Sequence, residues 1–173
     1  NRTDDYAVVI EQNIAHAMTS VMAQNEGAGE HKRVYRTFHY GMMLEIVYGV
    51  LAGIVFYFLA EPMMKLFTQD PEVVRIGAVY LHLIAFMYIL PGITNGLQGY
   101  FRGIGDLKIT LISSMVNMGV RVLAAFVFVF GFAMKVETFP FACLAGWIAM
   151  LITEVPLLVR SYGRLKHGEN AVI

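Results

Sequence analysis

The sequence predicts an all-α membrane protein, a polytopic bundle of about five transmembrane helices. Two observations predict this fold class. Hydrophobic residues make up 57% of the chain and charged residues only 15%, with a mean hydropathy of +0.59, whereas soluble domains carry about 25% charged residues. The apolar residues also form continuous runs of about 18 or more, which is the length of a membrane-spanning helix. Strands of a membrane barrel would instead show short alternating runs.

Five segments are expected to span the membrane. They are residues 5–25, 37–60, 73–97, 109–134 and 138–159. The first is the least apolar, because four neighbouring polar or ionisable side chains interrupt it. Each of the other four contains at least one ionisable residue, among them Glu45, His82, Arg121 and Glu154.

Turn-forming residues lie between these segments and predict where the helices end. Glycines favour helix C-termini and tight turns, and proline favours the first turn of a helix. The expected breaks are Gly27-Ala28-Gly29, Glu61-Pro62, Asp70-Pro71-Glu72, Gly103 with Gly105, and Phe139-Pro140.

The basic residues of the loops predict an orientation. Eight Lys and Arg residues follow the first, third and fifth spans, and four lie on the other side. The positive-inside rule places the richer side in the cytoplasm. The C-terminus is therefore expected in the cytoplasm and Asn1 outside, which indicates the continuation of a longer chain and hence the C-terminal part of a larger membrane protein.

Composition and motifs argue against several classes of function. A net charge of zero gives no basic stripe for nucleic acid. The single cysteine, Cys143, excludes a disulfide or zinc framework within this sequence and is expected to be a small apolar residue. No HExxH motif, nucleophile with partner residues or phosphate-binding loop is present, so we expect a protein that is not an enzyme, without cofactor or metal.

Two loop motifs carry a resemblance to a known family. The stretches QNEGAGEHKR and LQGYFRGIGDLK resemble loops of the multidrug and toxic compound extrusion (MATE) transporters, in which a similar pair of loops follows the second and fourth helices of each six-helix lobe. The matching residues are Gln24, Asn25, Gly27, Ala28, Gly29, Arg33, Arg102, Gly103, Gly105, Asp106 and Lys108. FTQDPEVVRIGAVYL, the helix-breaking Pro91 and NMGVR also resemble family features, and all the motifs occur in the family's order.

This resemblance implies helices eight to twelve of a twelve-helix transporter, so residues 1–173 would form a C-terminal lobe. The implied function is secondary active export of organic compounds, cationic ones included, by antiport with H+ or Na+ as coupling ion and alternating access. The implied partners are the lipid bilayer, the N-terminal lobe of the same transporter and a small organic substrate. The implied location is the bacterial inner membrane. The alternative is a flippase-type exporter of lipid-linked cargo from the same superfamily.

Two positions depart from the family pattern. Glu26 stands where the family loop is usually apolar. Pro91 stands where some sodium-coupled members have a carboxylate, which argues against that particular cation site here. The two loops themselves have two interpretations, a gate that rearranges during transport, or a topology anchor and helix cap.

Polar residues within the spans are the candidates for cation coupling or for lining a substrate cavity, because ionisable groups in a membrane normally face a cavity or a partner. They are Glu45, His82, His16, Gln12, Asn117 and Arg121. Helical spacing places them on three stripes. The stripes are Gln12/His16/Thr19/Ala23, Gly41/Glu45/Gly49/Gly53 and Ser113/Asn117/Arg121. The glycine stripe also suits close packing of neighbouring helices.

Structural roles remain open for several of these residues. Arg121 is expected to pair with a carboxylate or with helix-end carbonyl groups, and Glu154 to snorkel to the cytoplasmic surface. Methionines and aromatic residues either line an adaptable pocket for flat cations or pack against helices and lipid. These residues are Met18, Met22, Met42, Met43, Phe86, Met87 and Tyr88.

Glu45 and His82 are the ionisable residues expected to lie deepest in the membrane. A rise of about 1.5 Å per residue puts each of them roughly 12–13 Å along its helix, near the middle of a hydrocarbon layer about 30 Å thick. Glu45 has no oppositely charged residue three or four positions away. It is therefore either a carrier of the coupling proton or a hydrogen-bonded structural residue.

Overall fold

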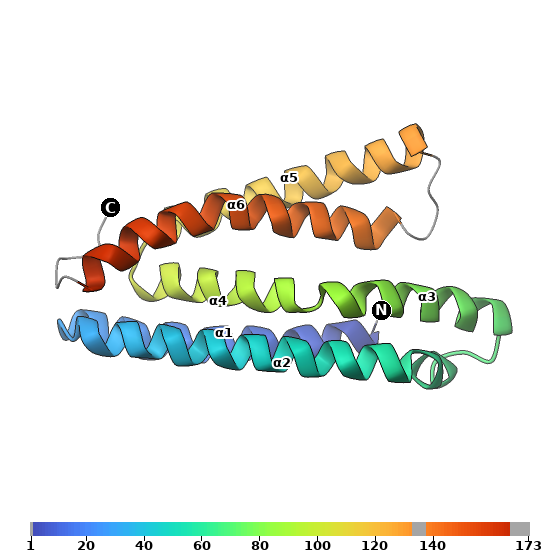
Figure 1. Ribbon diagram of the computed structural model, residues 1–173, viewed down its shortest axis with the longest axis horizontal. Coiled ribbons are helices and arrows are strands. Elements are labelled where there is room, and N and C mark those ends of the chain that lie inside the picture. Colours follow the sequence, from blue (N-terminus) through green and yellow to red (C-terminus); the bar gives the residue numbers. More distant parts are fainter. Residues whose placement is uncertain (1, 133–137, 167–173) are drawn as a thin grey trace.

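The structure, a computed structural model, describes residues 2–132 and 138–166, and these residues form six α-helices and no strand (Figure 1). The helices are α1 (Arg2–Gly27), α2 (His31–Lys65), α3 (Pro71–Met87), α4 (Ile89–Gly103), α5 (Leu107–Phe132) and α6 (Thr138–Lys166). The predicted all-α fold class is confirmed.

The helices form three layers. The row made by α3 and α4 lies between the pair α1 and α2 on one side and the pair α5 and α6 on the other (Figure 1). The α1–α2 and α4–α5 loops lie at the same end of the bundle as the C-terminal end of α6, and the α2–α3 loop lies at the opposite end. The loops predicted to share the cytoplasmic side are therefore together in space.

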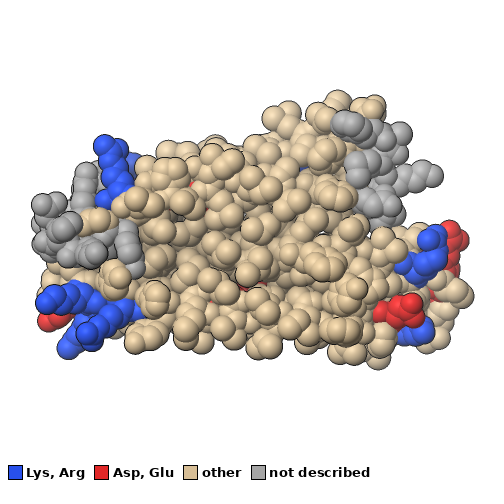
Figure 2. All heavy atoms as spheres, viewed as in Figure 1, with Lys and Arg blue, Asp and Glu red and all other residues tan. Residues whose placement is uncertain are grey.

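Four of the predicted spans have the length and apolar composition of membrane-crossing segments. Three are single helices, His31–Lys65, Leu107–Gly131 and Thr138–Ser161, and the fourth is the bent pair α3 and α4. The predicted span at 5–25 is a helix of 26 residues, about 39 Å long, which does not reach that apolar composition. Figure 2 shows charged residues of the visible face gathered mainly at its two ends, with few charged atoms in the band between them. The chain is a multi-pass membrane protein.

The predicted helix ends at Gly29 and Gly105 are confirmed, and both have the same geometry. Gly29 has a φ of 73° and Gly105 a φ of 84°, values that glycine adopts without steric cost. Around Gly29, backbone N–H groups bond from Glu30 to Asn25 (2.8 Å) and from Gly29 to Glu26 (2.9 Å). The same paired bonds surround Gly105. These are Schellman motifs, which satisfy the last carbonyl groups of α1 and α4.

The predicted start of α3 is confirmed as well. The side chain of Asp70 accepts hydrogen bonds from the backbone N–H groups of Glu72 (2.9 Å) and Val73 (3.4 Å). Pro71 occupies the first helical position, where its missing N–H costs nothing. Asp70 therefore caps α3 and ends the loop from α2.

Two predicted boundaries were wrong. α2 does not end at Glu61-Pro62 but continues to Lys65, because the φ of proline is compatible with a helix and Pro62 loses only one hydrogen bond. The predicted span 73–97 is two helices that meet at Tyr88 with a bend of 49°. Pro91 explains this bend, because its ring displaces the carbonyl group four residues earlier, that of Met87. Residues 133–134 of another predicted span lie outside the described residues.

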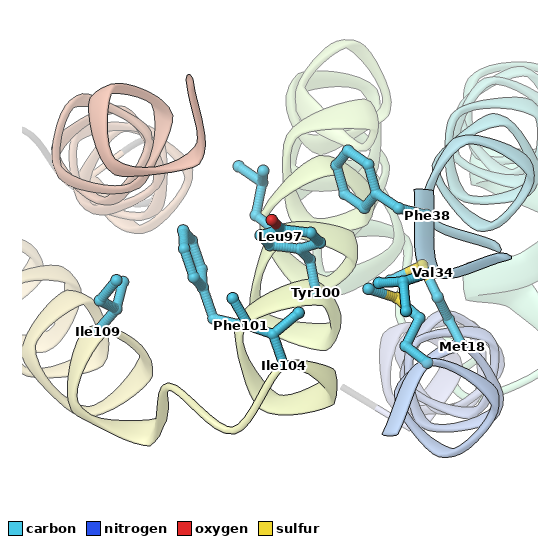
Figure 3. Packing of buried hydrophobic residues seen from close by; sticks show 9 residues of the cluster. Met18, Val34, Phe38, Leu97, Tyr100, Phe101, Ile104 and Ile109 are labelled. Carbon is cyan, nitrogen blue, oxygen red and sulfur yellow. The ribbon is translucent and has the colours of Figure 1, made fainter. Parts of the chain in front are cut away.

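Two apolar clusters hold the layers together. The α1–α2 loop with Gly29 and the α4–α5 loop with Gly105 are the two glycine loops. One cluster lies near the end of the bundle that carries them and takes residues from four helices (Figure 3). Tyr100 is at its centre, with its ring 4.8 Å from that of Phe38 and its hydroxyl group 2.7 Å from Oγ of Ser161. The second cluster joins α2 to α3 near the opposite end, around Leu81 and Tyr88. The predicted glycine stripe of α2 is buried between the clusters.

Candidate functional site

A polar cavity of about 390 Å³ lies between the α3–α4 row and the pair α5 and α6. Its wall combines amide and hydroxyl side chains with aromatic rings. The lining residues are Gln12, Tyr80, Ile84, Tyr88, Pro91, Thr94, Asn95, Gln98, Ser114, Asn117, Met118, Arg121, Phe139, Cys143, Trp147 and Met150. A cavity of this size and mixed lining is typical of a small-molecule site.

Several residues singled out in the sequence meet at this cavity. Gln12 reaches it from α1, Pro91 from α4, and Asn117 and Arg121 from α5. α4 presents polar groups beside its proline: Gln98 donates a hydrogen bond of 2.9 Å to Oγ of Ser114 across the gap to α5. The structure thus brings four separate sequence positions to one wall.

The polar stripe of α5 faces α6 along its whole length. Ser113 donates a bond of 2.6 Å to Oε1 of Glu154, and Nδ2 of Asn117 lies 3.2 Å from the sulfur of Met150. Glu154 is fully buried, so the expectation that it snorkels to the surface was wrong. The reason is that Ser113 supplies a donor inside the bundle.

Arg121 completes this stripe and points its head group at the cavity. Its Nη2 donates a hydrogen bond of 2.9 Å to Sγ of Cys143. Its aliphatic stem lies against Gly146, and a side chain at position 146 would collide with Cγ of Arg121. Among the described residues no carboxylate oxygen lies within 4.0 Å of its nitrogens. Among the described residues the expected pairing with a carboxylate or helix-end carbonyl groups is not found, and the hydrogen-bond partner of Arg121 is the sulfur of Cys143.

A second polar feature, a buried carboxylate, lies on the other face of α4. Glu45 is 0% exposed, and neither of its carboxylate oxygens has a hydrogen-bond partner among the described residues. Its Cγ would lie 3.6 Å from a Cβ placed on Gly96, and its backbone oxygen 3.0 Å from one placed on Gly92. The glycines of α4 therefore let α2 approach closely enough to enclose this side chain.

Glu11 on α1 reaches the same part of α4. It is also 0% exposed, and its Oε1 would lie 3.6 Å from a Cβ placed on Gly92. Two buried acidic side chains thus approach the glycine face of α4, one from each neighbouring helix.

Comparison with known proteins decides the family. The MatE family model matches residues 1–127 of the chain. The chain belongs to the MatE family. The resemblance inferred from the loop motifs is confirmed.

Relatives and solved structures agree with this assignment. The chain is 25% identical over 139 residues to "Probable multidrug resistance protein NorM" of Thermotoga maritima, covering 80% of the chain and 28% of that protein. It is 25% identical over 114 residues to the "FAD transporter" of Shewanella oneidensis, covering 64% of the chain and 25% of that protein. The MatE chain spans about a quarter of the length of these relatives.

The fold is that of solved MATE transporters. An inward-facing MATE family transporter of the MOP superfamily matches with a TM-score of 0.83 at 15% identity, over 88% of the chain and 34% of that structure. The eukaryotic MATE transporter AtDTX14 matches with a TM-score of 0.82 at 19% identity, over 99% and 39%.

The two histidines proposed from the MatE sequence do not line the polar cavity. His16 lies on an exposed face of α1. His82 has its ring 5.2 Å from that of Tyr57 and lines a different cavity of about 430 Å³, together with Lys65 and Arg75 near the α2–α3 loop. That cavity lies at the opposite end of the bundle from the glycine loops.

The loop motifs of the MatE chain end helices and hold short local contacts. Asn25 donates a bond of 2.7 Å to the carbonyl group of Val21, and Nε of Arg102 one of 3.2 Å to that of Gln98. His31 lies 3.2 Å from Glu26. Among the described residues no ion pair joins Arg102, Asp106 and Lys108. These contacts fit the helix-cap interpretation, and the gate interpretation remains a prediction.

Glu11 was not among the residues proposed from the sequence. The proposed stripe of α1 starts at Gln12, whereas the buried face is Glu11, Ala15, Met18 and Met22. α1 packs with that face on α4, where Oγ1 of Thr19 donates a bond of 3.1 Å to the carbonyl group of Gly99. The available indication was that Ala15, Met18 and Met22 follow Glu11 on one helix face and form an apolar stripe. Of the proposed pocket residues, Met18 and Met22 are core and Tyr88 lines the cavity.

Proposed function

We propose that this chain is the C-terminal lobe of a secondary active transporter that exports organic compounds in exchange for H+ or Na+. Family membership and the relatives named for multidrug resistance support export. The partners are an N-terminal lobe and the lipid bilayer, and the two lobes rock about a central site by alternating access. The location is the bacterial inner membrane, with the C-terminus in the cytoplasm, as the positive-inside rule predicts.

The observation that carries the coupling proposal is the buried carboxylate of Glu45. A carboxylate enclosed in an apolar bundle without a hydrogen-bond partner is costly unless a proton or cation neutralises it. Such a group can exchange one bound cation for another during transport. The neighbouring carboxyl group of Glu11 adds a second ligand of the same chemistry.

α4 connects the carboxylates with the polar cavity. The helix packs its glycines, Gly92 and Gly96, against Glu45, and turns Asn95 and Gln98 toward the cavity. Its bend at Tyr88 divides it from α3. A cation bound at Glu45 therefore changes the packing of the same short helix that lines the cavity, which is what antiport requires.

The experiment measures gradient-driven dye accumulation in inverted membrane vesicles containing the full-length transporter. We expect an imposed H+ or Na+ gradient to drive uptake, and Glu45→Gln to reduce the rate by an order of magnitude at an equal amount of folded protein. Glu45→Asp, which keeps the carboxylate, retains part of the rate. The matched control is Glu61→Gln, since Glu61 is an exposed acid at the end of the same helix.

Two results would contradict the proposal. Uptake that neither gradient drives argues against antiport. Uptake that Glu45→Gln and Glu61→Gln affect equally leaves Glu45 with a structural role.

A further inference from the structure

The charge of the polar cavity has a direct consequence for the substrate. Of the described residues that line the cavity, Arg121 is the one with a charged side chain, and the rest are amides, hydroxyl groups, sulfur-containing side chains and apolar or aromatic residues. A small cavity with one guanidinium group and an otherwise neutral wall has a positive potential. It repels cations and attracts anions.

The guanidinium group retains capacity for a ligand. Arginine has five N–H donors, and one of the Arg121 nitrogens is bonded to Sγ of Cys143, a weak acceptor. No carboxylate among the described residues neutralises it within 4.0 Å. A charge held in a membrane protein without a counter-charge is costly, and an anionic ligand would remove that cost.

Packing against α6 holds the side chain of Arg121 in place. The absence of a side chain at Gly146 leaves room for the arginine stem on α6, and Asn117 Oδ1 closes the same space, 3.0 Å from a Cβ placed on Gly146. Because the stem is held this way, the head group is fixed at the wall it shares with Cys143 and Trp147. A fixed, planar guanidinium group recognises a carboxylate through two parallel hydrogen bonds.

We propose that the cavity takes aromatic carboxylates, as anions or zwitterions, with the carboxylate on Arg121 and the planar ring system among Tyr80, Phe139 and Trp147. This inference rests on the proposed transport function and specifies its substrate class. A single guanidinium group matches a single negative charge. The assignment departs from the sequence-based expectation, which included cationic substrates and rested on methionines and on the aromatic residues Phe86 and Tyr88.

The test compares two dyes with the same ring system. Rhodamine 110 has a free carboxylate, and rhodamine 123 is its methyl ester and a cation. In proteoliposomes of the full-length transporter we expect counterflow of rhodamine 110 to be favoured at least about tenfold, since even a single hydrogen bond to a charged group contributes that factor. Arg121→Gln abolishes that preference, and Arg121→Lys retains part of it. Arg75→Gln, which changes an arginine outside the cavity, leaves the preference unchanged.

A further variant separates charge from packing. Cys143→Ala removes the sulfur that Arg121 contacts but leaves the guanidinium group, so the preference for rhodamine 110 persists if the charge selects the substrate. Equal or better counterflow of rhodamine 123 in the unmodified transporter overturns the inference and leaves the transport function standing. So does a preference that survives in Arg121→Gln. Failure to transport either dye argues against the proposed function itself.

Discussion

Ser113 on α5 donates a hydrogen bond of 2.6 Å to Oε1 of Glu154 on α6, and both side chains are fully buried. The bond joins two helices, and its two residues are 41 positions apart in the sequence. Because a buried carboxyl group without a donor is costly, Ser113 fixes the pairing of α5 and α6 at this level. The pairing in turn places Asn117 and Arg121 on the cavity wall.

We expect Ser113→Ala to lower the free energy of unfolding by about 1–3 kcal/mol, because the Glu154 oxygen then stays buried without its donor. The measurement is the thermal unfolding midpoint of the purified full-length protein in detergent. Ser113→Thr keeps a hydroxyl group and should restore most of the loss. Ser20→Ala is the control, since Ser20 is exposed and bonds only within its own helix. Equal midpoints for Ser113→Ala and Ser20→Ala would contradict this role.

Three helix ends could be predicted because the residues that cause them are local. Asp70 and Pro71 fix the start of α3, and Gly29 and Gly105 supply the positive φ values of two C-termini. The stripes of α2 and α5 were also predictable, since residues four apart share a helix face whatever packs against it.

The face of α1 could not be predicted in the same way. Two adjacent stripes, starting at Glu11 and at Gln12, have the same spacing and each begins with a polar residue, and the choice between them depends on α4. The glycines of α4 accept the methionines at 18 and 22, a match between segments about 80 residues apart. The hydrogen bond that keeps Glu154 inside the bundle depends on a distant partner for the same reason.

At Gly99, α1 and α4 approach so closely that there is little room for a side chain. A Cβ atom at Gly99 would lie 2.6 Å from Cε of Met18 and 3.1 Å from the backbone oxygen of Ala15. Methionine can move, but the backbone of α1 cannot move without separating the helices. We therefore expect Gly99→Ala to destabilise the full-length protein by about 1–3 kcal/mol, the usual cost of overpacking.

The same substitution at Gly119 provides the control for Gly99→Ala. Gly119 is also helical, and nothing lies within 4 Å of its Cβ position, so alanine there should be neutral or slightly stabilising. Thermal unfolding midpoints of the two variants are compared directly. If both variants unfold at the same temperature, the close approach of α1 and α4 is not needed for stability.

The two ends of the bundle should lie on opposite sides of the membrane, because basic residues concentrate at the end with the glycine loops. Lys32 and Lys108 are exposed near that end, and Gln69 is exposed in the α2–α3 loop at the other. We expect a cysteine at Gln69 to react with a membrane-impermeant maleimide in intact cells, and cysteines at Lys32 and Lys108 to react only after the cells are opened. Cys143 and any other native cysteines of the full-length protein are first replaced by alanine, and that background must show no labelling.

Labelling at Lys32 in intact cells, with Gln69 protected, would reverse the orientation and place the C-terminus outside. Labelling of all three in intact cells would contradict the predicted topology. α2 lies between residues 32 and 69 and is long enough to place them on opposite sides of the membrane.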